Sequence, residues 1–133
     1  QLVGQYTLTA QDILERKTFS DTIVHSAYPI DIHNPNGEGT ASTFMSEWGT
    51  YYSIPFGVLS SPSIRNLLVA GRCVSATFEA QAAIRTTPTA GSLGQAAGAA
   101  AALVVQAGTA VADVDILRLR QVLKEQDAYL DED

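Results

Sequence analysis

Three glycines with helical spacing are the first residues that point to chemistry. Gly91, Gly94 and Gly98 recur at intervals of three and four residues, and Ala101 and Ala102 continue the same side. A glycine inside a helix costs up to about 1 kcal/mol relative to alanine. Three on one face therefore indicate that something approaches the backbone closely. Either another element packs there or a flat ligand lies there, and the residues alone favour packing.

The expected start of this helix suits an electron-rich group. Thr87 is the expected N-cap, and Pro88 is expected at the first helical position, where its missing N–H costs nothing. Free backbone N–H groups and the positive end of the helix dipole favour an anionic or electron-rich ligand at this end. Gly108 is expected to cap the other end.

Titratable side chains suggest two further kinds of chemistry. His25, Asp31 and His33 include the ligand types of a transition-metal site, but their spacing along one expected strand favours no metal site. A pocket-facing His33 could move protons for a substrate, because histidine titrates near neutral pH. Arg85, which precedes the long helix, is equally consistent with orienting a substrate acid group and with a surface position.

Strands and helices must position these residues. The continuously apolar residues 67–70 predict a strand buried on both faces, and Gly71 ends it. Residues 22–33, where apolar and polar residues alternate, and residues 51–59 have strand character.

Two further helices flank this part of the chain. Thr9 predicts the N-cap of a short helix over about residues 10–16, with Asp12 in its first turn. Asp113 or Asp115 is expected to cap a last helix that runs to about Gln126. Short mixed or antiparallel strands, followed by a strand, a long Ala/Gly-rich helix and a last helix, predict an α+β fold.

Composition limits the class of protein. The 133 residues suffice for one domain with a core, and the net charge of −6 with scattered Lys and Arg argues against a nucleic-acid binder. The single cysteine, Cys73, excludes an internal disulfide and is expected to be buried at the end of the apolar strand. Residues 90–111 could span a membrane by length, but their Gln content and lack of basic or aromatic flanks favour a buried helix of a soluble protein.

Several familiar signatures are absent. The chain has no Gly-x-Gly-x-x-Gly fingerprint after a first strand, no P-loop and no Gly-x-Ser-x-Gly elbow. It begins at Gln1 and carries no leader sequence, so we expect a fragment of a longer protein, with a cytoplasmic location favoured.

Motifs along most of the chain resemble one family. They are NLLVAGRCVSAT at residues 66–77, IRTTPT at 84–89 and GQAAGAAA at 94–101. Upstream, VGQYTLTAQD at residues 3–12, YPIDIH at 28–33 and YSIPFG at 52–57 continue the likeness. In this order, the motifs are similar to the C-terminal portion of FAD-dependent oxidoreductases.

The resemblance implies a cofactor site shared between the Gly71 turn and the long helix. In the family the corresponding strand and helix close the flavin site, so Gly71 and Arg72 would lie against the ribityl and pyrophosphate portion of FAD. Amide groups of residues 90–93 would face the pyrimidine side of the flavin ring. The implied cofactor-binding residues are Gly71, Arg72, Cys73, Ser75, Pro88, Ala90, Gly91, Ser92, Leu93 and Gly94.

The same resemblance implies how the chain divides into regions and which partners it has. Residues 1–62 would belong to a β-rich region on the substrate side, and residues 63–133 to the FAD-binding domain. The missing fingerprint would lie upstream in the same protein, so this part alone is expected neither to bind FAD nor to be active. Expected partners are that upstream part and a small-molecule substrate, with a homo-oligomer open. Phe78 stands where the family often has histidine, which puts a proton-transfer role there in doubt.

Two other functions stay open on the residues alone. The first is a non-catalytic interaction domain that uses the Ala/Gly helix as a packing surface. The second, weaker hypothesis is a small metal-dependent enzyme that uses His25, Asp31 and His33.

Overall fold

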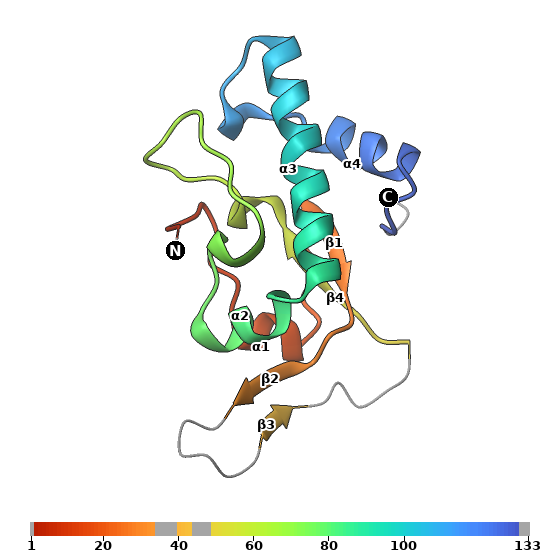
Figure 1. The fold of residues 1–133 in the computed structure, drawn as a ribbon. Coiled ribbons are helices and arrows are strands. Elements are labelled where there is room, and N and C mark those ends of the chain that lie inside the picture. The colour runs from red at the N-terminus through yellow and green to blue at the C-terminus, as the bar shows by residue number, and fades with distance from the viewer. Residues whose placement is uncertain (1, 34–39, 44–48, 131–133) are drawn as a thin grey trace.

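The computed structural model describes residues 2–33, 40–43 and 49–130. The described part has α+β architecture, as the sequence predicts, with a long helix running along most of the molecule (Figure 1). In chain order, its helices and strands are α1 (Ala10–Leu14), β1 (Thr22–Ser26), β2 (Ile30–His33), β3 (Thr40–Thr43), β4 (Tyr52–Pro55), α2 (Phe78–Ile84), α3 (Thr87–Ala107) and α4 (Ile116–Glu125). Three short 3₁₀ turns join them: η1 (Phe56–Val58), η2 (Gly71–Cys73) and η3 (Val111–Asp113).

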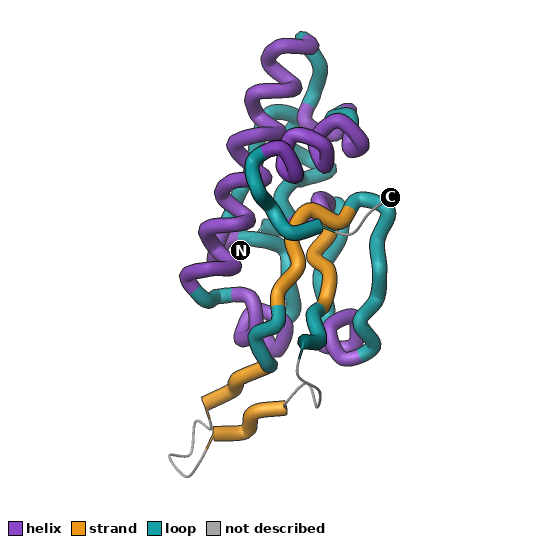
Figure 2. Tube along the Cα trace, turned by 90° about the vertical axis from the view of Figure 1, so that its right-hand side faces the viewer, coloured by secondary structure: helices purple, strands orange, loops and turns teal. Residues whose placement is uncertain are grey.

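Strands β1 and β4 form an antiparallel pair in the middle of the molecule (Figure 2). All four residues of β4 are buried, and Ser26 at the end of β1 lies opposite Tyr52. Helix α3 packs across β1, where the Ser26 and Thr89 hydroxyls lie 3.0 Å apart. This pair of strands therefore holds the first turns of α3 in place.

Strands β2 and β3 form a second antiparallel pair, which extends away from the first (Figures 1 and 2). The antiparallel strands that the sequence predicts are thus present in both pairs. His33 ends β2 opposite Thr40, but its side chain lies outside the part of the chain that is described.

Helix α1 begins with the cap that the sequence predicts. The Thr9 hydroxyl accepts a hydrogen bond from the Asp12 amide, and the Asp12 carboxylate accepts one from the Thr9 amide at 3.0 Å. Tyr6 Oη donates to the same carboxylate at 2.9 Å, and Lys17 Nζ lies 3.3 Å from it. Burial would raise the pKa of Asp12, but hydrogen bonds from Thr9, Tyr6 and Lys17 outweigh it and lower that pKa below its ordinary value.

Helix α3 starts one residue earlier than predicted. Thr86 is its N-cap, although its side chain caps no amide, and Pro88 is the second helical residue. Gly108 caps the other end with φ of 67°, as predicted. The buried side of α3 is formed by Thr89, Leu93, Ala96, Ala100 and Val104.

The predicted buried strand at residues 67–70 is wrong for this structure. These residues are half-buried, and their only ladder contact is an isolated bridge between Leu68 and Ser60. The Val69 amide donates to the Leu59 carbonyl at 2.9 Å on that side. An apolar run becomes a buried central strand only when other strands pair with both of its edges. No described strand pairs with the other edge of residues 67–70.

Helix α4 is capped by Asp115, whose carboxylate accepts a hydrogen bond from the Arg118 amide at 3.0 Å. Its apolar side points inward, with Leu119 and Leu123 buried. Arg120 is also buried, and its Nη1 donates to the Thr22 carbonyl at 2.7 Å. Across the described residues, no helix is both long and apolar enough for a membrane span.

Candidate functional site

The glycine side of α3 is open. A Cβ added at Gly91, Gly94 or Gly98 would meet no atom within 4 Å outside the helix's own neighbouring backbone. Close packing against another described element, which the residues alone favour, is therefore wrong for this structure. The face is available to a ligand or to a part of the protein beyond the described residues.

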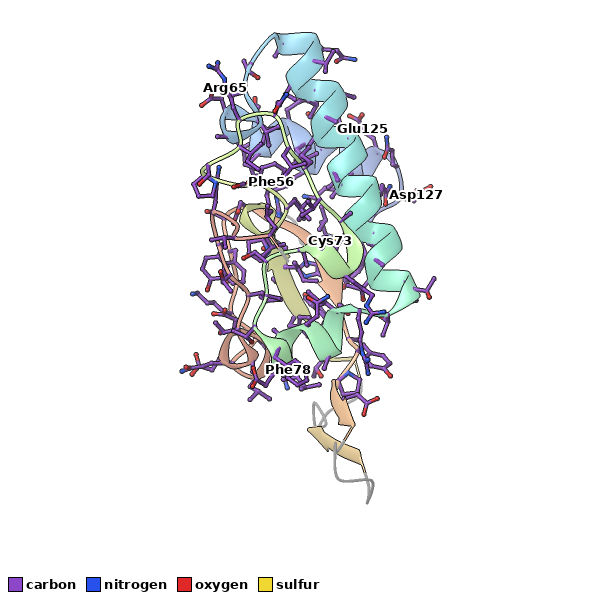
Figure 3. All side chains as sticks on the ribbon, turned by 60° about the vertical axis from the view of Figure 1, so that its left-hand side comes forward. Phe56, Arg65, Cys73, Phe78, Glu125 and Asp127 are labelled. Atoms are coloured by element: carbon purple, nitrogen blue, oxygen red, sulfur yellow. The ribbon has the colours of Figure 1, made fainter. Side chains whose placement is uncertain are left out.

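The η2 turn lies against the start of this helix (Figure 3). Gly71 has φ of 66°, and its added Cβ would lie 3.7 Å from the Ala90 Cβ. A non-glycine residue is disfavoured here by conformation rather than by space. Gln81 Nε2 donates to the Arg72 carbonyl at 3.1 Å and ties the turn to α2.

The turn exposes two of the predicted cofactor-binding side chains. Arg72 and Cys73 are both exposed. The expectation of a buried cysteine is wrong, because the residues before it form no buried strand that would carry Cys73 into the core. Both side chains are thus available to whatever lies on the turn.

Other predicted cofactor-binding residues divide into surface and core. Pro88, Gly91 and Gly94 are exposed, and Ala90 and Ser92 are half-buried. Ser75 is 1% exposed and shares a hydrogen bond with Thr7 at 2.9 Å, and Leu93 is fully buried. Ser75 and Leu93 are therefore core residues in this structure.

The amide groups of α3 differ from the expectation. The Ala90 amide donates to the Thr86 carbonyl at 2.9 Å, so the helix ladder is already engaged at residue 90. Because Pro88 has no N–H, the free donors of the first turn are the amides of Thr87 and Thr89. The positive end of the helix therefore lies at residues 87–89, slightly before the predicted residues 90–93.

Arg85 lies between the two helices. It is the C-cap of α2, its amide donates to Gln81, and its side chain is exposed. Its position next to the start of α3 fits either role that the sequence left open.

A pocket that sequence reasoning missed opens beside the first turns of α3. It has a volume of about 490 Å³ and is lined by His25, Ser26, Ala27, Tyr28, Pro29, Thr86, Pro88, Thr89 and Ser92. We call it the Ser26–Thr89 pocket. Ser26 and Thr89 are 63 positions apart, so no local pattern could have paired them.

His25 belongs to an aromatic cluster at the edge of this pocket. Its ring centroid lies 4.5 Å from that of Tyr51 and 6.0 Å from that of Tyr129. Its Nδ1 is 3.3 Å from Ser53 Oγ. Within the described residues no three His, Cys, Asp or Glu side chains group as metal ligands, so nothing supports the metal hypothesis for His25 and Asp31.

Tyr52 lies opposite Ser26 in the β1–β4 pair. Its side chain is 1% exposed, and its hydroxyl has no hydrogen-bond partner among the described residues. Burial raises the pKa of Tyr52 to about 12, and the nearby Ser26 hydroxyl offsets a part of this effect. The phenol therefore stays neutral and keeps its proton at ordinary pH.

Comparison with known proteins decides the family. The sequence profile of a family described as FAD dependent oxidoreductase matches residues 1–123. The chain belongs to this family. FAD is accordingly the cofactor of the parent protein. No significant similarity to a curated protein or to a solved structure was found.

Proposed function

We propose that this chain is the part of an FAD-dependent oxidoreductase that supplies the flavin-ring side of the cofactor site. Residues 63–133 would form that side, and residues 1–62 the adjoining region on the side of a small-molecule substrate. The observation that supports this most is the open glycine face of α3, which begins next to the Gly71 turn. Family membership supplies the identity of the flat ligand.

The residues present fit one portion of FAD. Gly91 and Gly94 leave space in which a Cβ would meet nothing, as a planar ring requires. Exposed Arg72 can pair with a phosphate or a carboxylate. The chain contains no Gly-x-Gly-x-x-Gly fingerprint for the pyrophosphate, so the rest of the cradle must come from elsewhere.

The chain would orient the cofactor and bias its electronics. Bound FAD supplies the oxidation and reduction chemistry. The free amides of Thr87 and Thr89 and the positive end of α3 would favour negative charge at the nearby end of the ring. The small side chains of α3 would allow close contact and exclude water from that face.

A preceding part of the same protein is the proposed main partner. The half-buried residues 67–70 bond to Leu59 and Ser60 on one side only, among the described residues. A strand from the partner on the other side would complete the sheet that their apolar sequence predicts. We expect the isolated chain to bind no FAD and to be inactive for this reason.

The test is to enlarge one residue on the open face of the flavin-loaded parent protein. Gly94→Leu should abolish or strongly weaken FAD binding, measured by flavin absorbance after gel filtration, while the circular dichroism spectrum is retained. Ala107→Leu, an exposed change on a different side of the same helix, is the control and should keep the flavin. Full flavin retention in Gly94→Leu would contradict the proposal.

An interaction domain is the second candidate, because the same face is open and Val105 on it is 79% exposed. A partner protein would then cover the small residues of α3. In that case Gly94→Leu would abolish association with the partner, and the parent protein would contain no flavin.

A further inference from the structure

The Ser26–Thr89 pocket has the character of a small-molecule site. Its volume of about 490 Å³ falls in the usual range for ligand pockets. Tyr28, Pro29 and Pro88 give it apolar walls, and hydroxyl groups provide most of its polarity. None of the described residues that line it is Asp, Glu, Lys or Arg, so it suits a ligand with an apolar body.

A string of hydroxyls forms the polar part of the pocket. The Thr86 hydroxyl donates to Thr89 Oγ1 at 3.1 Å, and Thr89 Oγ1 lies 3.0 Å from Ser26 Oγ. Thr89 and Ser26 are both more than nine-tenths buried. Three hydroxyls have three hydrogens but make only two bonds with one another, so one O–H remains to be donated.

Tyr52 places a fourth hydroxyl close to this string, although it does not line the pocket. Residues directly opposite in an antiparallel pair share a face, so Tyr52 points to the same side as Ser26, toward α3. Its buried hydroxyl lies close enough to the Ser26 hydroxyl for that group to lower the pKa of Tyr52 against the effect of burial, although the two make no hydrogen bond of good geometry. Because an unmade buried hydrogen bond is costly, the cluster favours an incoming acceptor that lets these hydroxyls reorganise.

The start of α3 reinforces this preference. Thr86, Pro88 and Thr89 line the pocket, so its wall includes the positive end of the helix. The one remaining O–H and the positive helix end both favour a ligand oxygen that accepts hydrogen bonds. A cationic group is disfavoured here, because no described lining residue is acidic and the helix end is positive.

We propose that the Ser26–Thr89 pocket binds the substrate of the oxidoreductase, and that this substrate has an apolar body with a carbonyl or carboxylate oxygen that accepts a hydrogen bond from Ser26 or Thr89. This inference rests on the proposed function. The Gly71 turn contacts Ala90, one residue after Thr89, so the proposed flavin side and the pocket share the first turns of α3.

The experiment is calorimetric titration of the flavin-loaded parent protein with three ring compounds. Benzoate carries a carboxylate, benzamide a neutral carbonyl, and benzylammonium only donors. We expect binding of benzoate, of benzamide or of both, and none of benzylammonium. Ser26→Ala and the nearly isosteric Thr89→Val should each weaken that binding about tenfold, the effect of losing one hydrogen bond to a charged oxygen.

Ser60→Ala is the matched control, because it removes a fully buried serine hydroxyl outside the pocket. It should leave binding within about twofold. The inference is overturned if neither benzoate nor benzamide binds at millimolar concentration, if benzylammonium binds as well as they do, or if both pocket variants fold and bind like the parent. A parent protein without flavin would instead refute the proposed function, whereas intact flavin with no binding refutes only the pocket.

Discussion

At the scale of single residues, the carboxylate of Asp12 combines several interactions. It completes the cap of α1 with Thr9, accepts a hydrogen bond from Tyr6 and lies 3.3 Å from Lys17 Nζ. The cation of Lys17 also lies 5.1 Å from the ring centroids of Tyr6 and Phe19. One acidic residue thus joins the N-terminal segment, the helix and the loop that follows it.

Asp12→Asn should lower the free energy of unfolding at pH 7 by about 1 kcal/mol, through loss of the charged cap and acceptor. Because folding lowers the pKa of Asp12, the stabilisation is fully present above the ordinary value of 3.8 and is lost as pH falls through the lowered value. Urea denaturation at pH 7 and below pH 3.8 measures both effects. Glu15→Gln, an exposed acid at the end of the same helix, is the control, and an equal Asp12→Asn deficit at both pH values would contradict the account.

Gly4 is a residue where added volume should be harmful. A Cβ there would lie 2.7 Å from both the Gly57 carbonyl oxygen and the Ser75 Cβ, too close for either to remain in place. Gly4→Ala should therefore reduce the free energy of unfolding by about 1–3 kcal/mol, the usual cost of overpacking. A denaturation midpoint equal to that of the unmodified protein would show that the backbone at Gly4 can move aside.

Residue-level predictions from the sequence succeeded where the cause is local. The caps at Thr9 and Gly108 depend on a few adjacent residues and are confirmed, and Asp115 is the cap among the two expected for α4. The cap of α3 was wrong by one residue, because Thr86 and not Thr87 takes that position. The pairing of Ser26 with Thr89 joins positions 63 apart, and the burial of Arg120 depends on a carbonyl in β1. Such contacts follow from tertiary structure, which no short pattern contains.

At the scale of elements, α3 combines a well-packed side with an open one. Leu93, Ala96 and Ala100 are fully buried against the rest of the chain. The glycines on the other side lower the stability of the helix, and no contact with a described residue compensates for that cost. Spacing predicted which residues share a face, but not that this face would be open, because a bare stripe is equally compatible with packing.

Gly98→Ala should stabilise the protein without FAD by about 0.5–1 kcal/mol, because the methyl group meets no atom within 4 Å and alanine favours the helix. Thermal or urea denaturation of the FAD-free protein measures the change. A destabilised variant would mean that the face is packed against another element in solution. The opposite sign expected for Gly4→Ala provides an internal comparison.

Residues 67–70 show the other limit of reading elements from sequence. Their apolar run predicts a strand, yet they are half-buried and bonded along one side. A central strand needs a hydrogen-bonded neighbour along both of its edges. Among the described residues, 67–70 have such a neighbour along one edge only. The apolar pattern therefore fits the strand that these residues would form in the proposed longer protein, whereas the structure contains this chain alone.

At the scale of the whole molecule, the open α3 face, the exposed η2 turn and the half-buried residues 67–70 are unfinished surfaces of one chain. In the proposed function, a longer flavoprotein of the same family would cover them with FAD and with further strands. The α+β class followed from the order of elements in the sequence. Which surfaces stay open could only be seen once the described residues were placed in three dimensions.

The visible absorption spectrum of the purified parent protein tests the central claim most directly, with the isolated chain titrated with FAD beside it. We predict a bound-flavin spectrum in the parent protein and no FAD binding by the chain alone, because the chain contains no Gly-x-Gly-x-x-Gly fingerprint for the pyrophosphate. A colourless parent protein that fails to take up added FAD would contradict the account.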